Sequence, residues 1–226
     1  MNWLDVTGAP GVGKSTICDP LWHSQLRLDD GKLPPLEWAP FIETITGLLE
    51  ILHPYGPELY VPALRMNLRS LKKMAAVARM DGAGPYIQAG LIQRGLGFGW
   101  RLNMVGLDVN LIRPFFETMP VSLGVAVLTA SRETIIARNH ARKDNPATAH
   151  EDRAFMVPLM EAPREIALEV LRGRGVPIVT IDTEQRSPDE ARADLIAFAA
   201  AQAGNPEAIR SGSEGAVLPS PPAWWQ

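Results

Sequence analysis

The residues with the clearest chemistry lie near the start of the chain, where positions 8–16 read GAPGVGKST. This run satisfies the phosphate-loop pattern G-x-x-x-x-G-K-[ST]. In such a loop the glycines let successive backbone N–H groups turn toward phosphate oxygens, and the lysine reaches the β- and γ-phosphates. The serine hydroxyl that follows can bind Mg²⁺. The pattern therefore predicts a nucleotide site at this point of the chain.

The expected roles follow from the position of each residue in the motif. We expect Lys14 to act on the γ-phosphate during catalysis, Ser15 to hold Mg²⁺, and ATP with Mg²⁺ to be the cofactors. The residues expected to bind the nucleotide are Gly8, Ala9, Pro10, Gly11, Val12, Gly13, Lys14, Ser15 and Thr16.

The elements that must position this loop are strands alternating with helices. Short apolar segments bounded by turn residues predict strands at 2–7, 36–40, 85–90, 121–130 and 176–183. Helical periodicity and capping residues predict helices at 13–22, 41–52, 59–80, 91–103, 108–119, 132–143, 153–175 and 187–204. This alternation predicts an α/β fold with a parallel sheet of about five strands and helices on both faces.

Length and composition indicate one soluble domain. The chain has 226 residues, 46% of them hydrophobic, and a net charge of −3. Residues 1–204 are expected to form the domain, and the Gly/Ser/Pro-rich residues 205–226 a disordered tail. Cys18 is the single cysteine, which excludes an intrachain disulfide, and no Lys or Arg precedes Lys14, which argues against a secretory signal. We expect a cytoplasmic protein with no membrane partner.

Beyond the loop, two further stretches carry a resemblance. These are VAVLTASRETIIARNHARK, followed by EDR, and VPIVTIDT near the end. With GAPGVGKST they make residues 1–203 similar to the small P-loop kinases of the nucleoside and nucleotide kinase clan. The resemblance implies a three-layer α-β-α fold with a helical lid and a phosphotransferase activity. It also implies that Arg138, Arg142 and Arg153 are lid arginines that hold the charge of the migrating phosphoryl group.

The chain departs from the clan's pattern where an acid is usual. The stretch QAGLIQRG has Gln88 and Ala89 at the expected acidic positions, and glutamine cannot act as a base. Arg94 in the same stretch resembles the clan's arginine that contacts the acceptor or a phosphate. Glu37 in LEWAP resembles the acid after strand two in deoxynucleoside kinases, which accepts the proton of the acceptor hydroxyl. The other substitute carboxylates considered are Asp5, Glu43 and Asp108.

The acceptor is the least defined part of the sequence-based interpretation. The overall likeness extends to bacteriophage kinases that phosphorylate 5-hydroxymethyluracil within DNA, so a nucleotide-like acceptor, DNA included, is expected. A free nucleoside or nucleotide is an alternative, and so is a regulatory module that binds a nucleotide with little chemistry. Trp38 and Trp100 either stack on a base or pack in the core. The basic residues of 59–80, which either contact a polyanion or form a solvated face, are Arg65, Arg69, Lys72, Lys73 and Arg79.

Overall fold

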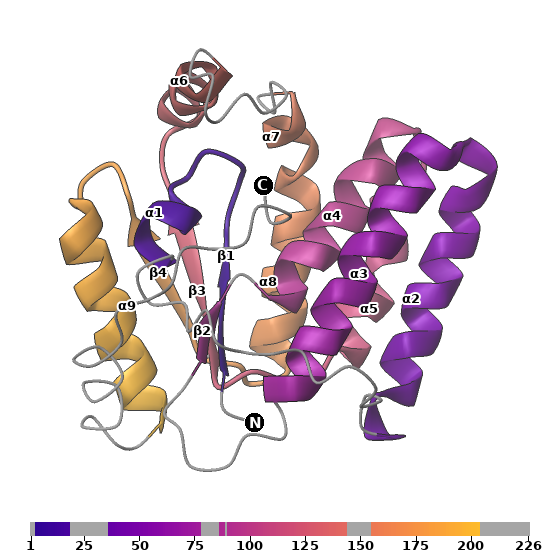
Figure 1. Cartoon of the computed structure of the whole chain (residues 1–226), viewed down its shortest axis with the longest axis horizontal. Coiled ribbons are helices and arrows are strands. Elements are labelled where there is room, and N and C mark those ends of the chain that lie inside the picture. The colour runs from indigo at the N-terminus through magenta and orange to yellow at the C-terminus, as the bar shows by residue number, and fades with distance from the viewer. Residues whose placement is uncertain (1–2, 19–35, 78–85, 89, 144–154, 204–226) are drawn as a thin grey trace, which may run out of the picture.

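A four-stranded parallel sheet forms the centre of the fold (Figure 1). The computed structural model describes residues 3–18, 36–77, 86–88, 90–143 and 155–203. Within them the strand order is β2-β1-β3-β4. The strands are β1 (Trp3–Thr7), β2 (Tyr86–Gln88), β3 (Gly124–Thr129) and β4 (Ile178–Asp182).

Both faces of the sheet are buried because successive side chains of each strand point to opposite sides. On β3, Val125 and Val127 belong to one core cluster, whereas Ala126 and Leu128 belong to the other. Figure 1 shows α1 and α9 on one side of the sheet and the larger group of helices on the other. The α/β arrangement with a doubly covered parallel sheet is thus confirmed for the described strands.

The helices fall into two layers. Helices α1 (Lys14–Cys18) and α9 (Pro188–Ala203) contact each other on one side of the sheet. The layer on the other side consists of α2 (Ala39–Leu52), α3 (Pro57–Val77), α4 (Leu91–Met104), α5 (Arg113–Thr118) and α8 (Glu161–Gly173). The remaining elements are α6 (Arg132–Lys143), α7 (Met156–Leu159), and the 3₁₀ turns η2 (Leu36–Trp38), η3 (His53–Tyr55) and η4 (Val109–Ile112). None of the described helices is long and apolar enough to cross a membrane.

The strand predicted at 36–40 is wrong. Residues 36–38 form the turn η2, and Ala39 begins α2 with Pro40 in its first turn. Proline favours the first turn of a helix, where its missing N–H has no partner to lose. The sheet therefore has four strands in the described residues, not about five. The expected lid includes residues 144–154, which lie between α6 and α7 and outside the described residues. The expected tail, residues 205–226, also lies outside them.

The capping expected from the sequence is present at two helices. The Ser187 hydroxyl accepts from Glu190 N at 3.3 Å, and the Glu190 carboxylate accepts from Ser187 N at 2.8 Å. This reciprocal pair is a capping box. The Ser131 hydroxyl likewise accepts from Thr134 N at 3.2 Å before α6.

The strand order places a ligand site at the carboxyl end of β1. After β1 the chain adds β2 on one side, then crosses to add β3 on the other side of β1. Ligands of open parallel sheets bind where the order reverses in this way. Gly8, the first residue of the phosphate loop, follows directly after β1.

A buried acid on β1 fixes the start of α4. Asp5 has no exposed surface, and its two carboxyl oxygens accept from Gly90 N at 3.0 Å and Ile92 N at 3.3 Å. A Cβ on Gly90 would lie 2.5 Å from Asp5 Oδ2, so glycine is required there. Asp5 therefore satisfies amide groups that begin α4 and are left without intrahelical partners. It has no surface from which to take a proton from an acceptor.

We predict that Asp5→Asn changes how stability depends on pH. Burial raises the pKa of Asp5 from 3.8 to about 7. The folded protein then binds this proton more tightly than the unfolded chain, so Asp5 lowers the free energy of unfolding progressively as pH rises from about 4 to about 7. In urea unfolding across this range, Asp5→Asn should gain stability relative to wild type as pH rises. A pH-independent difference between the two proteins would contradict the prediction.

Candidate phosphate-binding site

The loop between β1 and α1 has a backbone that other residues could not adopt. Gly8, Gly11 and Gly13 have φ of 151°, 87° and 99°. A Cβ on Gly8 would lie 2.6 Å from the Leu128 carbonyl oxygen, and one on Gly11 would lie 2.5 Å from Asn139 Nδ2. At Gly13 a Cβ would meet no heavy atom within 4 Å. The first two glycines thus allow close packing on β3 and α6, and the third faces open space.

Lys14 lies folded over the start of the loop. Its Nζ donates to the Gly8 carbonyl oxygen at 2.6 Å and to the Ala9 carbonyl oxygen at 2.9 Å. Ser15 and Thr16 follow on the first turn of α1, and both are exposed. The arrangement leaves the Ser15 hydroxyl open to a ligand while the ammonium group stays at the loop, as the motif requires.

Two side chains of α6 fix the position of the loop: Asn139 directly, and Arg138 through Thr183. Asn139 Nδ2 donates to the Pro10 carbonyl oxygen at 2.8 Å. Arg138 donates to the carbonyl oxygen and to the hydroxyl of Thr183, at 2.8 and 2.9 Å, and the Thr183 hydroxyl donates to the Val12 carbonyl oxygen at 2.9 Å. Arg138 and Thr183 thus connect the phosphate loop to the turn after β4. These contacts favour a positioning role for Arg138, which the sequence suggested as a lid arginine.

A cavity of about 450 Å³ lies on one flank of the loop. Its walls are the loop from Gly11 to Gly13, the first turns of α1, α6, and the β4–α9 turn with Thr183, Glu184 and Arg186. This volume falls in the range of small-molecule sites, 300–1,000 Å³. The cavity thus borders the turn between β4 and α9.

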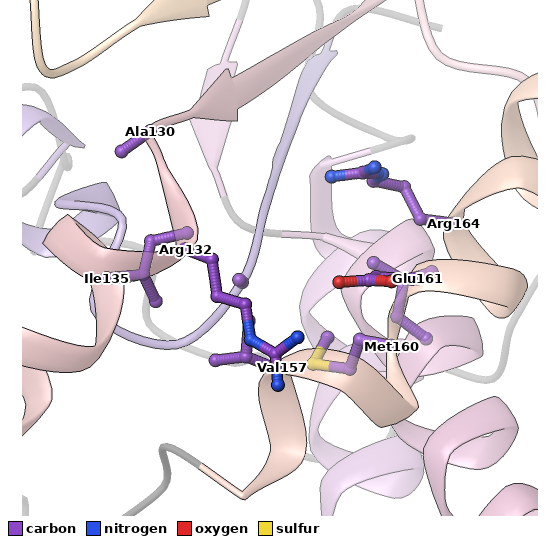
Figure 2. A pocket seen from close by; sticks show the side chains of 9 residues that line it. Ala130, Arg132, Ile135, Val157, Met160, Glu161 and Arg164 are labelled. Carbon is purple, nitrogen blue, oxygen red and sulfur yellow. The ribbon is translucent and has the colours of Figure 1, made fainter.

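A second cavity, of about 200 Å³, lies on the Ala9 flank of the loop. Figure 2 shows Arg132, at the start of α6, and Arg164, on α8, approaching it from different sides, with Glu161 between them. These three residues were missed in the sequence analysis. Arg132 lies more than 25 positions before Glu161 and Arg164 in the sequence, and no sequence motif contains all three residues. Sequence analysis therefore offered no signal for this group.

Helix α4 brings one polar side chain, that of Gln93, to the start of the loop. Gln93 Oε1 accepts from the Thr7 hydroxyl at 3.3 Å and from Gly8 N at 3.4 Å. The next residue, Arg94, points toward α3, where its Nε donates to Ser70 Oγ at 2.7 Å. Burial lowers the pKa of Arg94, and the nearby Asp5 opposes that shift. Arg94 therefore lies in the first turn of α4, but its side chain is turned toward α3, and its contact with an acceptor or a phosphate stays a prediction.

Glu37 is not brought to the loop. It is exposed on η2, beside Trp38, whose ring packs edge-to-face on Trp3 with 6.4 Å between the centroids. Trp3 begins β1 and Thr7 ends it, so the two ends of the strand are about 13 Å apart. Trp38 is a core residue at 1% exposure, and its neighbour Glu37 lies at the end of the sheet opposite the phosphate loop.

The other candidate residues are placed as follows. Asp108 caps η4 by accepting from Asn110 N at 2.9 Å. Arg142 lies on α6, but its side chain is outside the described part of the chain, as are Ala89 and Arg153. The side chain of Gln88 is also outside it, although its backbone pairs with Asp5 of β1.

Among the described residues, the Ser15 hydroxyl is the group expected to bind Mg²⁺, together with the phosphates of a bound nucleotide. Among the described residues no three His, Cys, Asp or Glu side chains gather into a metal site. An exposed serine hydroxyl at the first turn after the loop suits the single protein ligand that this motif supplies. Mg²⁺ would then take its remaining oxygen ligands from phosphate groups and water, which is a common way for proteins to bind it.

The comparisons with known proteins give a likeness in fold only. No protein-family model matches the sequence, and no curated protein matches it. The chain is similar to the solved structure of deoxyadenosine kinase from M. mycoides with bound dCTP, with a TM-score of 0.47 and 16% sequence identity. The superposition covers 86% of this chain and 97% of that chain. A function for this chain must therefore be argued from its own residues.

We predict that Thr183→Val weakens nucleotide binding through the loop. The substitution keeps the side-chain volume but removes the hydroxyl that donates to Val12 O and accepts from Arg138. We expect a loss of about 1–3 kcal/mol in unfolding free energy, because the carbonyl group of the buried Val12 and the half-buried guanidinium of Arg138 each lose a partner. Calorimetric titration with ATP should show reduced affinity. Thr46→Val, at an exposed position of α2, is the control, and equal ATP affinity in all three proteins would refute the positioning role.

Proposed function

We propose that this protein is an ATP- and Mg²⁺-dependent kinase that transfers the γ-phosphoryl group to a hydroxyl of a nucleotide-type acceptor. The observation that carries the proposal is the phosphate loop with a cavity on each flank. The larger cavity suits a nucleoside, and the smaller one holds two arginines beside Ala9. A protein that only stores a nucleotide needs the first cavity, whereas a transferase also needs space on the far side of the γ-phosphate.

The chemistry is a single displacement at phosphorus. The acceptor oxygen forms a bond to the γ-phosphorus, the bond from that phosphorus to the β–γ bridging oxygen breaks, and ADP leaves. The hydroxyl proton passes to water or to a carboxylate. The carboxylate in the smaller cavity is Glu161, and it takes the place in this proposal that the sequence left open at Gln88. Little covalent work by the protein is required, because positioning and charge neutralisation account for most of the catalysis.

Arginine side chains would stabilise the charge on the transferred group. Arg132 and Arg164 lie at the smaller cavity. Arg132 is the first candidate for this role, because Arg164 is paired with Glu165 at 3.1 Å and would have to leave that partner. Arg142 and Arg153 remain candidates from the sequence. Arg138 is assigned to holding the loop, because its guanidinium is occupied by Thr183.

For the acceptor, the most specific form of the proposal is 5-hydroxymethyluracil within phage DNA. A basic surface supports a polyanionic partner, since Arg65, Arg69 and Lys72 are all exposed on α3. The target base would have to leave the stack for its hydroxymethyl group to reach the γ-phosphate. A free nucleoside or nucleotide as acceptor is the alternative within the kinase class.

A regulatory module that binds a nucleotide without transfer is the alternative from another class. It is favoured by the absence of an acid at Gln88 and Ala89. The cavity with Arg132, Arg164 and Glu161 argues against it, because a binding module has no need of charged groups beyond the γ-phosphate.

We predict that Lys14→Ala abolishes phosphoryl transfer and weakens ATP binding with little change in stability. The lysine is the cation that the motif brings to the γ-phosphate, and it donates to the carbonyl oxygens of Gly8 and Ala9, which water can also satisfy. Transfer is measured with γ-labelled ATP, and stability by thermal unfolding. Arg172→Ala, an exposed change on α8, serves as the control. Normal turnover in folded Lys14→Ala would overturn the kinase proposal.

We predict that, when DNA containing 5-hydroxymethyluracil, free nucleosides and free nucleotides are compared as acceptors, the protein phosphorylates the DNA. With γ-labelled ATP, labelling of this DNA should fall steeply with salt, because each phosphate contact releases counterions. Unmodified DNA of the same sequence is the control and should stay unlabelled. Efficient labelling of a free nucleoside or nucleotide, with hydroxymethylated DNA unlabelled, would replace the DNA acceptor by a small molecule. ATP binding with no acceptor labelled would favour the regulatory module.

A further inference from the structure

Three glycines of α4 have different surroundings. A Cβ on Gly95 would clash with the ring of Phe116, and one on Gly99 would lie 2.5 Å from Pro163 Cβ. These two glycines permit close packing of α4 on α5 and α8. Among the described residues, a Cβ on Gly97, between them, would meet only Arg101 Nη1, at 3.5 Å. Packing of α4 on its neighbours therefore does not explain this third glycine.

Two arginines lie on the same face of α4 as Gly97. Positions 94, 97 and 101 are three and four residues apart, so they form one stripe along the helix. Arg101 folds back along this stripe, and its Nη1 donates to the Gly97 carbonyl oxygen at 2.6 Å. Its guanidinium carbon lies 4.4 Å from the centroid of the Trp100 ring. Arg94, one turn before Gly97, reaches to Ser70 on α3.

The positive charge of this stripe is not balanced by ion pairs. Neither Arg94 nor Arg101 forms an ion pair with a carboxylate in the described part of the chain. Arg101 is only 5% exposed, and its Nε has no hydrogen-bond partner there. Asp5 is the acidic group that acts on Arg94, and Arg69 of α3 adds a repulsive positive charge.

Without a ligand, the charge on the Arg101 guanidinium is destabilised by its burial and by the like charge of Arg94. Burial, together with the smaller effect of the Arg94 charge, lowers the pKa of Arg101 to about 10. A buried charge without a partner costs several kcal/mol, and an apolar residue of similar size is often more stable at such a position. A buried guanidinium group beside a half-buried one, with no ion pair to Arg101 in the described residues, is an arrangement that an anion would stabilise.

We propose that Arg94, Gly97 and Arg101 form an anion site on α4 that binds a phosphate group of the acceptor. This inference rests on the proposed kinase function and narrows its substrate class. The acceptor would carry a phosphate in addition to its reacting hydroxyl, so it would be a nucleotide or a nucleic acid strand and not an uncharged nucleoside. Gly97 places no side chain against the Arg101 guanidinium, and the two guanidinium groups would donate to the phosphate oxygens.

The position of the stripe fits an acceptor next to the phosphate loop. Gln93, directly before Arg94, bonds Thr7 and Gly8 at the start of that loop. The half-buried Trp100 ring borders the stripe at its other end, beside Arg101. A ligand that lies along α4 can thus place a phosphate on the arginines and another part near the loop.

The test is equilibrium binding without ATP, so that it does not depend on turnover. The full chain is titrated with thymidine, thymidine 5′-monophosphate and a fluorescent single-stranded DNA. Arg101→Met should lower affinity for the phosphate-bearing ligands by about tenfold or more, because one charge-assisted contact is lost. It should also raise the thermal midpoint, because the uncompensated buried charge is removed. Binding of the nucleotide alone, or of DNA alone, identifies which source of phosphate the site accepts.

Two further variants separate the site from a packing role. Gly97→Leu fills the space above the stripe and should also lower affinity for phosphate-bearing ligands, whereas a Gly97→Ala chain should remain folded because a Cβ there meets only an ordinary contact. Arg113→Gln removes an exposed arginine paired with Glu169 and is the charge-matched control. The inference is overturned if Arg101→Met binds both phosphate ligands as wild type does, or if thymidine binds as tightly as its monophosphate. If the Lys14 experiment fails while these affinities fall, the kinase function is wrong and the anion site stands.

Discussion

The hydrogen bonds from the start of α4 to Asp5 determine the geometry of the whole site. A carboxyl group on the central strand accepts from Gly90 N and Ile92 N, so the helix can begin only at this point. The next residues along α4 are Gln93, which touches the phosphate loop, and Arg94, which faces α3. A shift of α4 by one residue would move both side chains by about 100° around the helix axis. An acid that is fully buried can thus determine where Gln93 meets the phosphate loop and where Arg94 meets α3.

Short-range features were predictable from the sequence. The phosphate loop is one continuous run, and its glycines, lysine and serine are recognised by type and spacing. Ser187 and Glu190 lie within a single helical turn, so their capping box could be anticipated in part from Ser187 alone. The strands with several β-branched or apolar residues, such as 121–130, were predicted because both faces of a parallel strand are buried.

Features that depend on distant segments were not predictable. Asp5 and Gly90 are 85 positions apart, so the role of Asp5 in starting α4 requires the register between β1 and β2. The strand expected at 36–40 failed because LEWAP is equally compatible with a helix start at a proline, and the packing of Trp38 on Trp3 decides between the two. Arg101 gave no signal, because a single arginine in an apolar helix reads as a surface charge until its burial is known.

The hydrogen bonds of Lys14 have a consequence for which anions the loop retains. With its Nζ on the carbonyl oxygens of Gly8 and Ala9, the lysine is already partly satisfied, so an incoming anion competes with the protein's own backbone. A single orthophosphate offers few replacement contacts and gains little from this exchange. A triphosphate bound as the motif predicts would span the loop and contact several N–H groups at once, so its gain would be larger. The resting position of one side chain would then favour polyphosphates over simple phosphate.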